Sequence, residues 1–179
     1  MTDTTKSNAT ITITADSYSG PLNFLSHGGA FSYNGSDNVQ VTAVNAINPL
    51  IATGSGVDLL TGSSTGTSVL DAGTNANIET DGGSGDTAFI QNGYVAGTTW
   101  DFIQNFHGAD EDIIFGYIPG LSKIAVQALG GLGSDMGATV TIHPGNGNIE
   151  EATFVGIGLS ALHGTSAMID GVPSWVLWT

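Results

Sequence analysis

Acidic and amide side chains recur at nearly regular spacing in the middle of this sequence, each close to glycine. The segment 54–62, GSGVDLLTG, fits the pattern G-x-G-x-D-x-U, in which U is a large apolar residue. The position of Asp58 recurs ten residues on and then twice at intervals of nine residues, where it is held by Ser68, Asn77 and Asp86. Carboxylate and carbonyl oxygens are the ligands that Ca²⁺ prefers in proteins. The repeat therefore predicts calcium ligands at a series of turns.

Each repeat predicts a tight turn followed by a very short strand. The turn needs glycine because some of its residues must adopt a positive φ. The strand contributes one apolar side chain to a narrow interior, such as Leu60 in the first repeat. Two repeats make one full coil, so we expect Asp58 to stack on Asn77 and Ser68 on Asp86. Each of these pairs keeps only one carboxylate, which predicts weak calcium sites.

A second group of acids follows the repeats. Asp101, Asp110, Glu111 and Asp112 lie within twelve residues, and Gly108 permits a sharp turn among them. Neighbouring carboxylates repel one another unless they are solvated or bound to a cation. A solvated polar loop and a calcium site are both consistent with this pattern, and both stay open at this point. The residues predicted to bind calcium are Asp58, Asn77, Asp81, Asp86, Asp101, Asp110 and Asp112.

The composition excludes several classes of function. The 179 residues include sixteen Asp and Glu against two Lys and no Arg, for a net charge of −14. Nucleic acids and anionic membrane surfaces require a basic protein surface, so we expect neither as a partner. No apolar stretch has the roughly 18 residues needed for membrane insertion. The four His share no short spacing and no G-x-S-x-G motif is present, so we expect that the protein is not an enzyme.

The hydrophobic pattern predicts an all-β fold. Apolar and polar residues alternate with a period of two in TITITA at 10–15, and VQVTAVNAI at 39–47 is a second expected strand. No segment shows clear helical periodicity, although the segment 123–129 is consistent with a short helix or a strand. We divide the chain into an N-terminal β segment at 1–51, a degenerate repeat region at 52–95 and a β-rich cap at 96–179.

The repeat region and the segment after it resemble the RTX (hemolysin-type) calcium-binding proteins that bacteria secrete. GGSGDTAF at 82–89 is similar to the GGSGxDTF that often ends the repeats of that family, with one residue shifted. The segment that follows such repeats in the family also has a counterpart here, formed by Trp100, Asp101, Ile103, Phe106 and His107 and then GADEDIIFG at 108–116. The resemblance extends to residue 179, and in it His107 is interpreted as a structural hydrogen-bonding residue.

This resemblance implies a parallel β-roll or β-helix whose folding is triggered by Ca²⁺. It also implies an extracellular protein that carries an uncleaved C-terminal secretion signal. The N-terminus agrees with that expectation because it contains no apolar signal-peptide region. The chain has no Cys, so disulfides and thiolate metal sites are excluded.

Together these features predict an extracellular calcium-binding structural protein of the bacterial surface or matrix, such as an adhesin, a surface-layer subunit or a filament subunit. We expect calcium to promote its assembly into a homo-oligomer or polymer. The alternative is a calcium-dependent carbohydrate-binding module that stacks a surface polysaccharide on Trp100, Trp175 and Trp178. For these aromatic side chains we favour a packing role, in which they form a cap over the open end of the roll.

Overall fold

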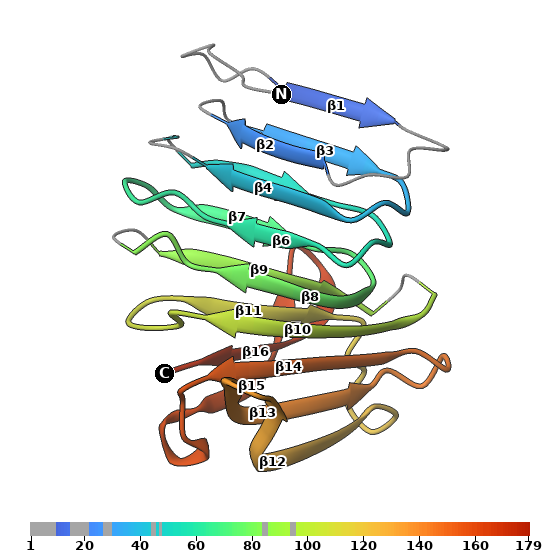
Figure 1. Ribbon diagram of the computed structural model, residues 1–179. Helices are drawn as coiled ribbons and strands as arrows, with labels where there is room; N and C mark the ends of the chain where they lie inside the picture. Colours follow the sequence, from blue (N-terminus) through green and yellow to red (C-terminus); the bar gives the residue numbers. More distant parts are fainter. Residues whose placement is uncertain are drawn as a thin grey trace.

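The computed structural model describes residues 10–14, 22–26, 30–43, 46, 48–83, 86–93 and 96–179. The chain winds into a parallel β-solenoid in which successive strands up to residue 115 join two eight-stranded sheets in turn (Figure 1). The predicted all-β fold, a parallel β-roll or β-helix with a β-rich cap, is confirmed. Within the described ranges the helical structure is one 3₁₀ turn, η1 (Leu159–Ala161).

Up to residue 115 the strands of the chain alternate between the two sheets, and the last five strands lie in one sheet as a group of three and in the other as a group of two. In spatial order, the first sheet contains β1 (Thr10–Thr14), β3 (Ala30–Asn34), β5 (Leu50–Ala52), β7 (Ser68–Asp71), β9 (Thr87–Asn92), β11 (Glu111–Phe115), β16 (Val172–Trp178) and β15 (His163–Ile169). The second contains β12 (Lys123–Leu132), β13 (Asp135–His143), β14 (Ile149–Val155), β10 (Thr98–Gln104), β8 (Asn75–Thr80), β6 (Leu59–Thr61), β4 (Val39–Ala43) and β2 (Leu22–Ser26).

Parallel pairing extends beyond the repeat region at 52–95. It begins with β1 against β3 and β2 against β4, and it continues to β11 and β14. The remaining strands form antiparallel pairs at the end of the stack, from β14 through β13 to β12 and from β11 through β16 to β15. Residues 123–129, consistent with helix or strand in the sequence, belong to strand β12.

A coil of the repeat region is one residue longer than two units of nine. Val41 pairs with Leu60, and Leu60 pairs with Glu79 in the next coil. The turns stack so closely that glycine is required at two of them. A Cβ on Gly73 would lie 1.8 Å from the carbonyl oxygen of Gly54, and Gly73 has a φ of 72°. A Cβ on Gly54 would lie 2.1 Å from the carbonyl oxygen of the glycine one coil earlier, at position 35.

The core lies between the two sheets. Alternate residues of the strands from β3 to β9 point inward, and in-register rows such as Ile51, Leu70 and Phe89 are fully buried. This arrangement explains why the apolar positions of the repeat recur, because each coil places its own side chain on the one before it. The same rows also position the acidic residues that follow.

Candidate metal centre

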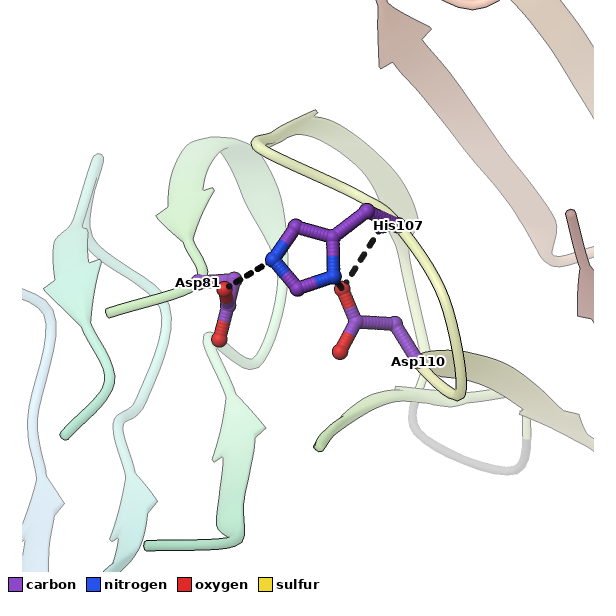
Figure 2. A group of neighbouring side chains, drawn as sticks. All are labelled: Asp81, His107 and Asp110. Carbon is purple, nitrogen blue, oxygen red and sulfur yellow. Dashed lines mark hydrogen bonds and ion pairs between the residues drawn. The ribbon is translucent and has the colours of Figure 1, made fainter. Parts of the chain in front are cut away.

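Two buried carboxylates and one imidazole meet at the edge of the solenoid (Figure 2). Asp81 directly follows β8, whereas His107 and Asp110 lie in the turn between β10 and β11. Because β8 and β10 are neighbours in register, their ends come together, and the Asp81 backbone N–H donates to the Gln104 carbonyl oxygen at 3.1 Å. The Asp110 N–H donates to the His107 carbonyl oxygen at 3.0 Å, which closes the turn. We call Asp81, His107 and Asp110 the edge cluster.

The imidazole lies between the two carboxylates. His107 Nε2 is 3.2 Å from Asp81 Oδ2, and His107 Nδ1 is 3.7 Å from Asp110 Oδ2. Both carboxylates are fully buried, whereas the His107 side chain is 53% exposed. The imidazole therefore covers the acidic pair on the side that faces solvent, and the family-based interpretation of His107 as a hydrogen-bonding residue is consistent with these contacts.

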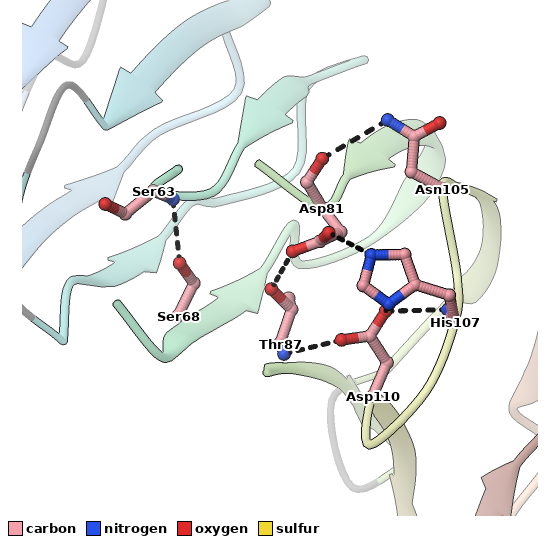
Figure 3. Close-up of polar contacts among 7 residues, drawn as sticks. All are labelled: Ser63, Ser68, Asp81, Thr87, Asn105, His107 and Asp110. Carbon is pink, nitrogen blue, oxygen red and sulfur yellow. Dashed lines mark hydrogen bonds and ion pairs between the residues drawn. The ribbon is translucent and has the colours of Figure 1, made fainter. Parts of the chain in front are cut away.

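Thr87 holds both carboxylates in place (Figure 3). Its hydroxyl donates to Asp81 Oδ1 at 2.6 Å and its backbone N–H donates to Asp110 Oδ1 at 2.8 Å. The backbone N–H of His107 donates to Asp110 Oδ2 at 2.8 Å. The pair is thus fixed from two directions before any cation binds, which lowers the entropy cost of forming a metal site.

The electrostatics of the edge cluster favour a cation. Burial raises the pKa of Asp110, the backbone donors of His107 and Thr87 lower it, and the nearby charge of Asp81 raises it again. One ligand atom from each of Asp81, His107 and Asp110 lies within 4.8 Å of the others, and no other group of three His, Cys, Asp or Glu in the described ranges meets that condition. Carboxylate oxygens suit Ca²⁺, whereas imidazole nitrogen suits zinc and related metals.

Asp58, Asn77 and Asp101 form a ladder across three coils. The Val39 N–H donates to Asp58 Oδ1 at 2.8 Å, and the Asp58 N–H donates to Asn77 Oδ1 at 3.1 Å. Asn77 Nδ2 then donates to Asp101 Oδ1 at 3.0 Å. The expected stacking of Asp58 on Asn77 is confirmed, and Asp101 extends it by one coil. Asp58 and Asn77 use these contacts to satisfy backbone N–H groups of the preceding coil, and calcium binding by this row stays a prediction.

The expected stacking of Ser68 on Asp86 is wrong by one position. Ser68 pairs in register with Thr87, because a coil is one residue longer than two units of nine. Asp86 contributes its backbone carbonyl oxygen, which accepts from the Ser68 N–H at 2.9 Å, and the residue itself is exposed. The Ser68 hydroxyl oxygen instead accepts from the Ser63 N–H at 2.8 Å (Figure 3).

The sequence analysis missed two acids in the interior, Glu79 and Glu150. They are fully buried, as are Asp101 and Asp112, and we call these four residues the interior acid cluster. Glu79 takes the row position that Leu60 and Ile103 hold in neighbouring strands. In the other sheet, Asp112 takes the position that Phe89 and Leu177 hold. These two acids thus replace large apolar side chains in the core.

The carboxylate oxygens of the interior acid cluster accept hydrogen bonds from few donors. The Ala72 N–H donates to Glu79 Oε1 at 3.0 Å, and Gln91 Nε2 lies 3.2 and 3.3 Å from the two oxygens of Asp112. Several buried oxygens in and beside the cluster have no hydrogen-bond partner among the described residues: Glu79 Oε2, Asp101 Oδ2, Gln91 Oε1 and both oxygens of Glu150. The sequence supplies two Lys and no Arg, and Lys123 is exposed on β12. The other, Lys6, lies outside the described residues.

Burial raises the pKa of every member of this cluster. The pKa of Asp112 rises to about 8 and that of Glu150 to about 7. The pKa values of Glu79 and Asp101 are raised well above their usual range, mainly by burial and further by neighbouring carboxylates. The cluster is therefore neutral only when it holds protons or a cation.

A signal for part of this cluster is present in the sequence. Asn77, Glu79 and Asp81 alternate along and just after β8, and a period of two places them on one face of a strand. Asn77 was expected to face a ligand, so the same alternation places the Glu79 side chain on the face of the strand that Asn77 occupies. Glu150 has no comparable signal, because its approach to the others depends on β14 pairing with β10, a strand far earlier in the chain.

The tryptophans proposed as a sugar platform lie in ring pairs. Trp100 packs on Phe102 with ring centroids 4.7 Å apart, and its Nε1 donates to Thr153 Oγ1 at 3.0 Å. Trp175 packs on Tyr117 at 5.0 Å, and Trp178 lies 6.0 Å from the ring of His163. A cavity of about 360 Å³ along the stacked turns is lined by residues such as Thr53, Asp71 and Asn92, with no tryptophan among them.

In comparisons with known proteins, the chain matches no family model, no curated protein and no solved structure. Among the described residues no helix has the length and apolar character to cross a membrane. The fold and the clusters together define the class as a parallel β-solenoid that carries buried acids both at its edge and in its interior.

Proposed function

We propose that this protein is an extracellular calcium-binding structural protein of the bacterial surface, of the RTX type, that assembles with copies of itself. The observation that supports it best is the pair of buried carboxylates, Asp81 and Asp110. They come from different coils, and each is fixed by a donor of Thr87. A calcium ion held between them would tie one coil to the next.

Charge explains why such a protein would need calcium to fold. The net charge of −14 opposes compaction, and the two buried carboxylates oppose each other at short range. Bound calcium would reduce both the repulsion from the net charge and the repulsion between the two buried carboxylates. Extracellular calcium modules bind with dissociation constants of about 10⁻⁴–10⁻³ M, so the site would fill outside the cell and stay largely empty in the cytosol. The coupling of folding to export follows from that difference.

The test is a calcium titration of chelator-treated protein, followed by isothermal titration calorimetry and circular dichroism. We expect calcium binding and increased thermal stability, with magnesium as the comparison ion. Asp110→Asn keeps an oxygen acceptor for Thr87 but removes the charge, and it should weaken calcium binding at least about tenfold. Glu111→Gln is the matched control, because Glu111 is an exposed neighbouring acid, and it should bind calcium as the wild type does.

His107→Gln provides a second variant, which the fold should tolerate because the side chain is half exposed. Calcium affinity should persist in it, because two hard carboxylates remain. Equal stability in chelator and in calcium, with no heat of binding, would contradict the proposal. Stabilisation by zinc alone, lost in His107→Gln, would also contradict it and would assign the edge cluster to a transition metal.

A further inference from the structure

Exposed apolar side chains gather at the C-terminal end of the stack. Nine large apolar residues are exposed in the described part of the chain, and six of them lie between positions 118 and 136. On β12 itself Val126 is 55% exposed, Leu129 65% and Leu132 66%. Terminal coils of solenoids usually carry a polar outer face that keeps them soluble. This end therefore has the composition of a contact surface.

The strand that carries these side chains is also an edge. β12 is the last strand of its sheet and pairs only with β13 among the described strands (Figure 1). Its ten residues contain no Pro and no acid, and Lys123 is its one charged residue. Proteins usually protect long edges with charges, proline or short strands. The one such device in β12 is an irregularity in its pairing between Gln127 and Gly130. Before it, the outer backbone groups of residues 123–127 are available to another strand.

We propose that two copies of this chain pair edge to edge along β12, in antiparallel orientation about a two-fold axis. The sheet of each copy would then continue into the sheet of the other. This inference rests on the self-association in the proposed function but does not depend on calcium. A two-fold pairing uses the same patch on both copies, so every contact is made twice.

Strand length favours β12 of the second copy as the occupant. The edges at the opposite end of the stack, β1 and β2, have five residues each, whereas β12 has ten, with an irregularity in its pairing between Gln127 and Gly130. Pairing β12 with itself forms the longer ladder. It also closes after two copies, whereas pairing with β1 or β2 of a second copy would continue into a filament.

Charge supports the same choice. No Asp or Glu occurs between positions 113 and 134, although the chain as a whole carries −14. Contact between two copies is therefore least opposed at this end. Antiparallel pairing also brings Lys123 of each copy toward the end of the other β12, where Asp135 begins the adjacent strand. The two opposite charges would lie near each other twice in the dimer.

The first experiment measures mass by size-exclusion chromatography with light scattering, both in calcium and in chelator. The wild type should have twice the monomer mass of 18.1 kDa. Val126→Lys and Leu129→Lys should return the mass to that of the monomer and weaken dimerisation at least about tenfold. Val57→Lys is the matched control, because Val57 is also 55% exposed but lies in the turn before β6. It should remain a dimer.

The second experiment tests whether the two copies meet along the middle of β12. Because the native chain has no Cys, a single Ala128→Cys near the middle of β12 should form an intermolecular disulfide under mild oxidation. Val57→Cys should not. A monomeric wild type in both conditions, an open polymer, or dimers that survive both lysine variants would overturn the inference. Dimers that form equally in chelator would support it while removing the role of calcium in assembly, so the two proposals fail separately.

Discussion

The interior acid cluster makes the stability of the solenoid depend on pH in a defined direction. Asp112 and Glu150 have a pKa of about 8 and about 7 in the folded protein, against ordinary values of 3.8 and 4.5. The folded state therefore retains protons that the unfolded state has already released. The stabilisation is complete below about pH 4, declines as the pH rises, and is lost once the pH has passed about 7 for Glu150 and about 8 for Asp112.

The size of the effect follows from the two shifts. One unit of pKa corresponds to about 1.4 kcal/mol, so the shift at Asp112 is worth on the order of 5 kcal/mol and that at Glu150 on the order of 3 kcal/mol. Both side chains are buried in the core, so solvent screens them little. Their sum is comparable with the total stability of an ordinary domain, about 5–15 kcal/mol. Loss of these protons should unfold the protein when no cation replaces them.

The assay is urea unfolding followed by circular dichroism, in chelator, at intervals between about pH 5 and pH 9. The free energy of unfolding should fall from about pH 5 to about pH 8, most steeply below about pH 7 where both groups contribute, and it should level off above about pH 8. Asp112→Asn still accepts from Gln91 but cannot ionise, so it should flatten the curve near pH 8. Asp170→Asn, at an exposed acid, is the control and should leave the curve unchanged. A free energy that stays constant or rises from pH 6 to pH 9 would refute the reasoning.

Three further substitutions test the packing around the clusters by urea unfolding. Glu79→Leu introduces the residue that the preceding coil has at Leu60, and at pH 8 it should raise the unfolding free energy by about 1–4 kcal/mol, because it replaces a buried carboxyl group with an unsatisfied oxygen by an apolar side chain. No gain would contradict the assignment of Glu79 to the core. Leu60→Ala should cost about 2–5 kcal/mol, and a smaller loss would show that the row is loosely packed. Gly73→Ala should cost more than about 1 kcal/mol through its contact with Gly54 and its positive φ, whereas Gly158→Ala, with open space and an extended backbone, should change little.

The fold was predictable because its signal is local. The spacing of Asp58 and Leu60 in the first repeat already indicates a turn followed by a short inward strand, and the stacking of Asp58 on Asn77 followed from it. The number of residues in one coil was harder to predict from the sequence. Because each coil has one additional residue, Ser68 pairs with Thr87 and not with Asp86. No rule based on composition distinguishes these two strand registers.

The sequence predicted the residues of the edge cluster only in part, and it predicted the interior acid cluster to a smaller extent. Asp81 and Asp110 were both expected to bind calcium, but their meeting depends on the register of β8 with β10 and on the turn that returns the chain to β11. Asp112 was predicted to bind calcium, with a solvated polar loop as the alternative. It is a core residue because β11 lies between β9 and β16, and β16, the strand that covers it, comes from the C-terminal end of the chain.

The two clusters place different demands on a cation. At the edge, the His107 imidazole already lies against both carboxylates and is open to solvent, so an ion that binds there must displace it or share the site with it. In the interior no basic side chain is present among the described residues, and protons are the simplest neutralising species. Acid pH should therefore stabilise the interior whether or not the edge is filled, whereas calcium should act at the edge even at pH 5. Stabilisation by calcium that vanishes at low pH would place its main effect in the interior instead, because there protons and calcium would compete for the same oxygens.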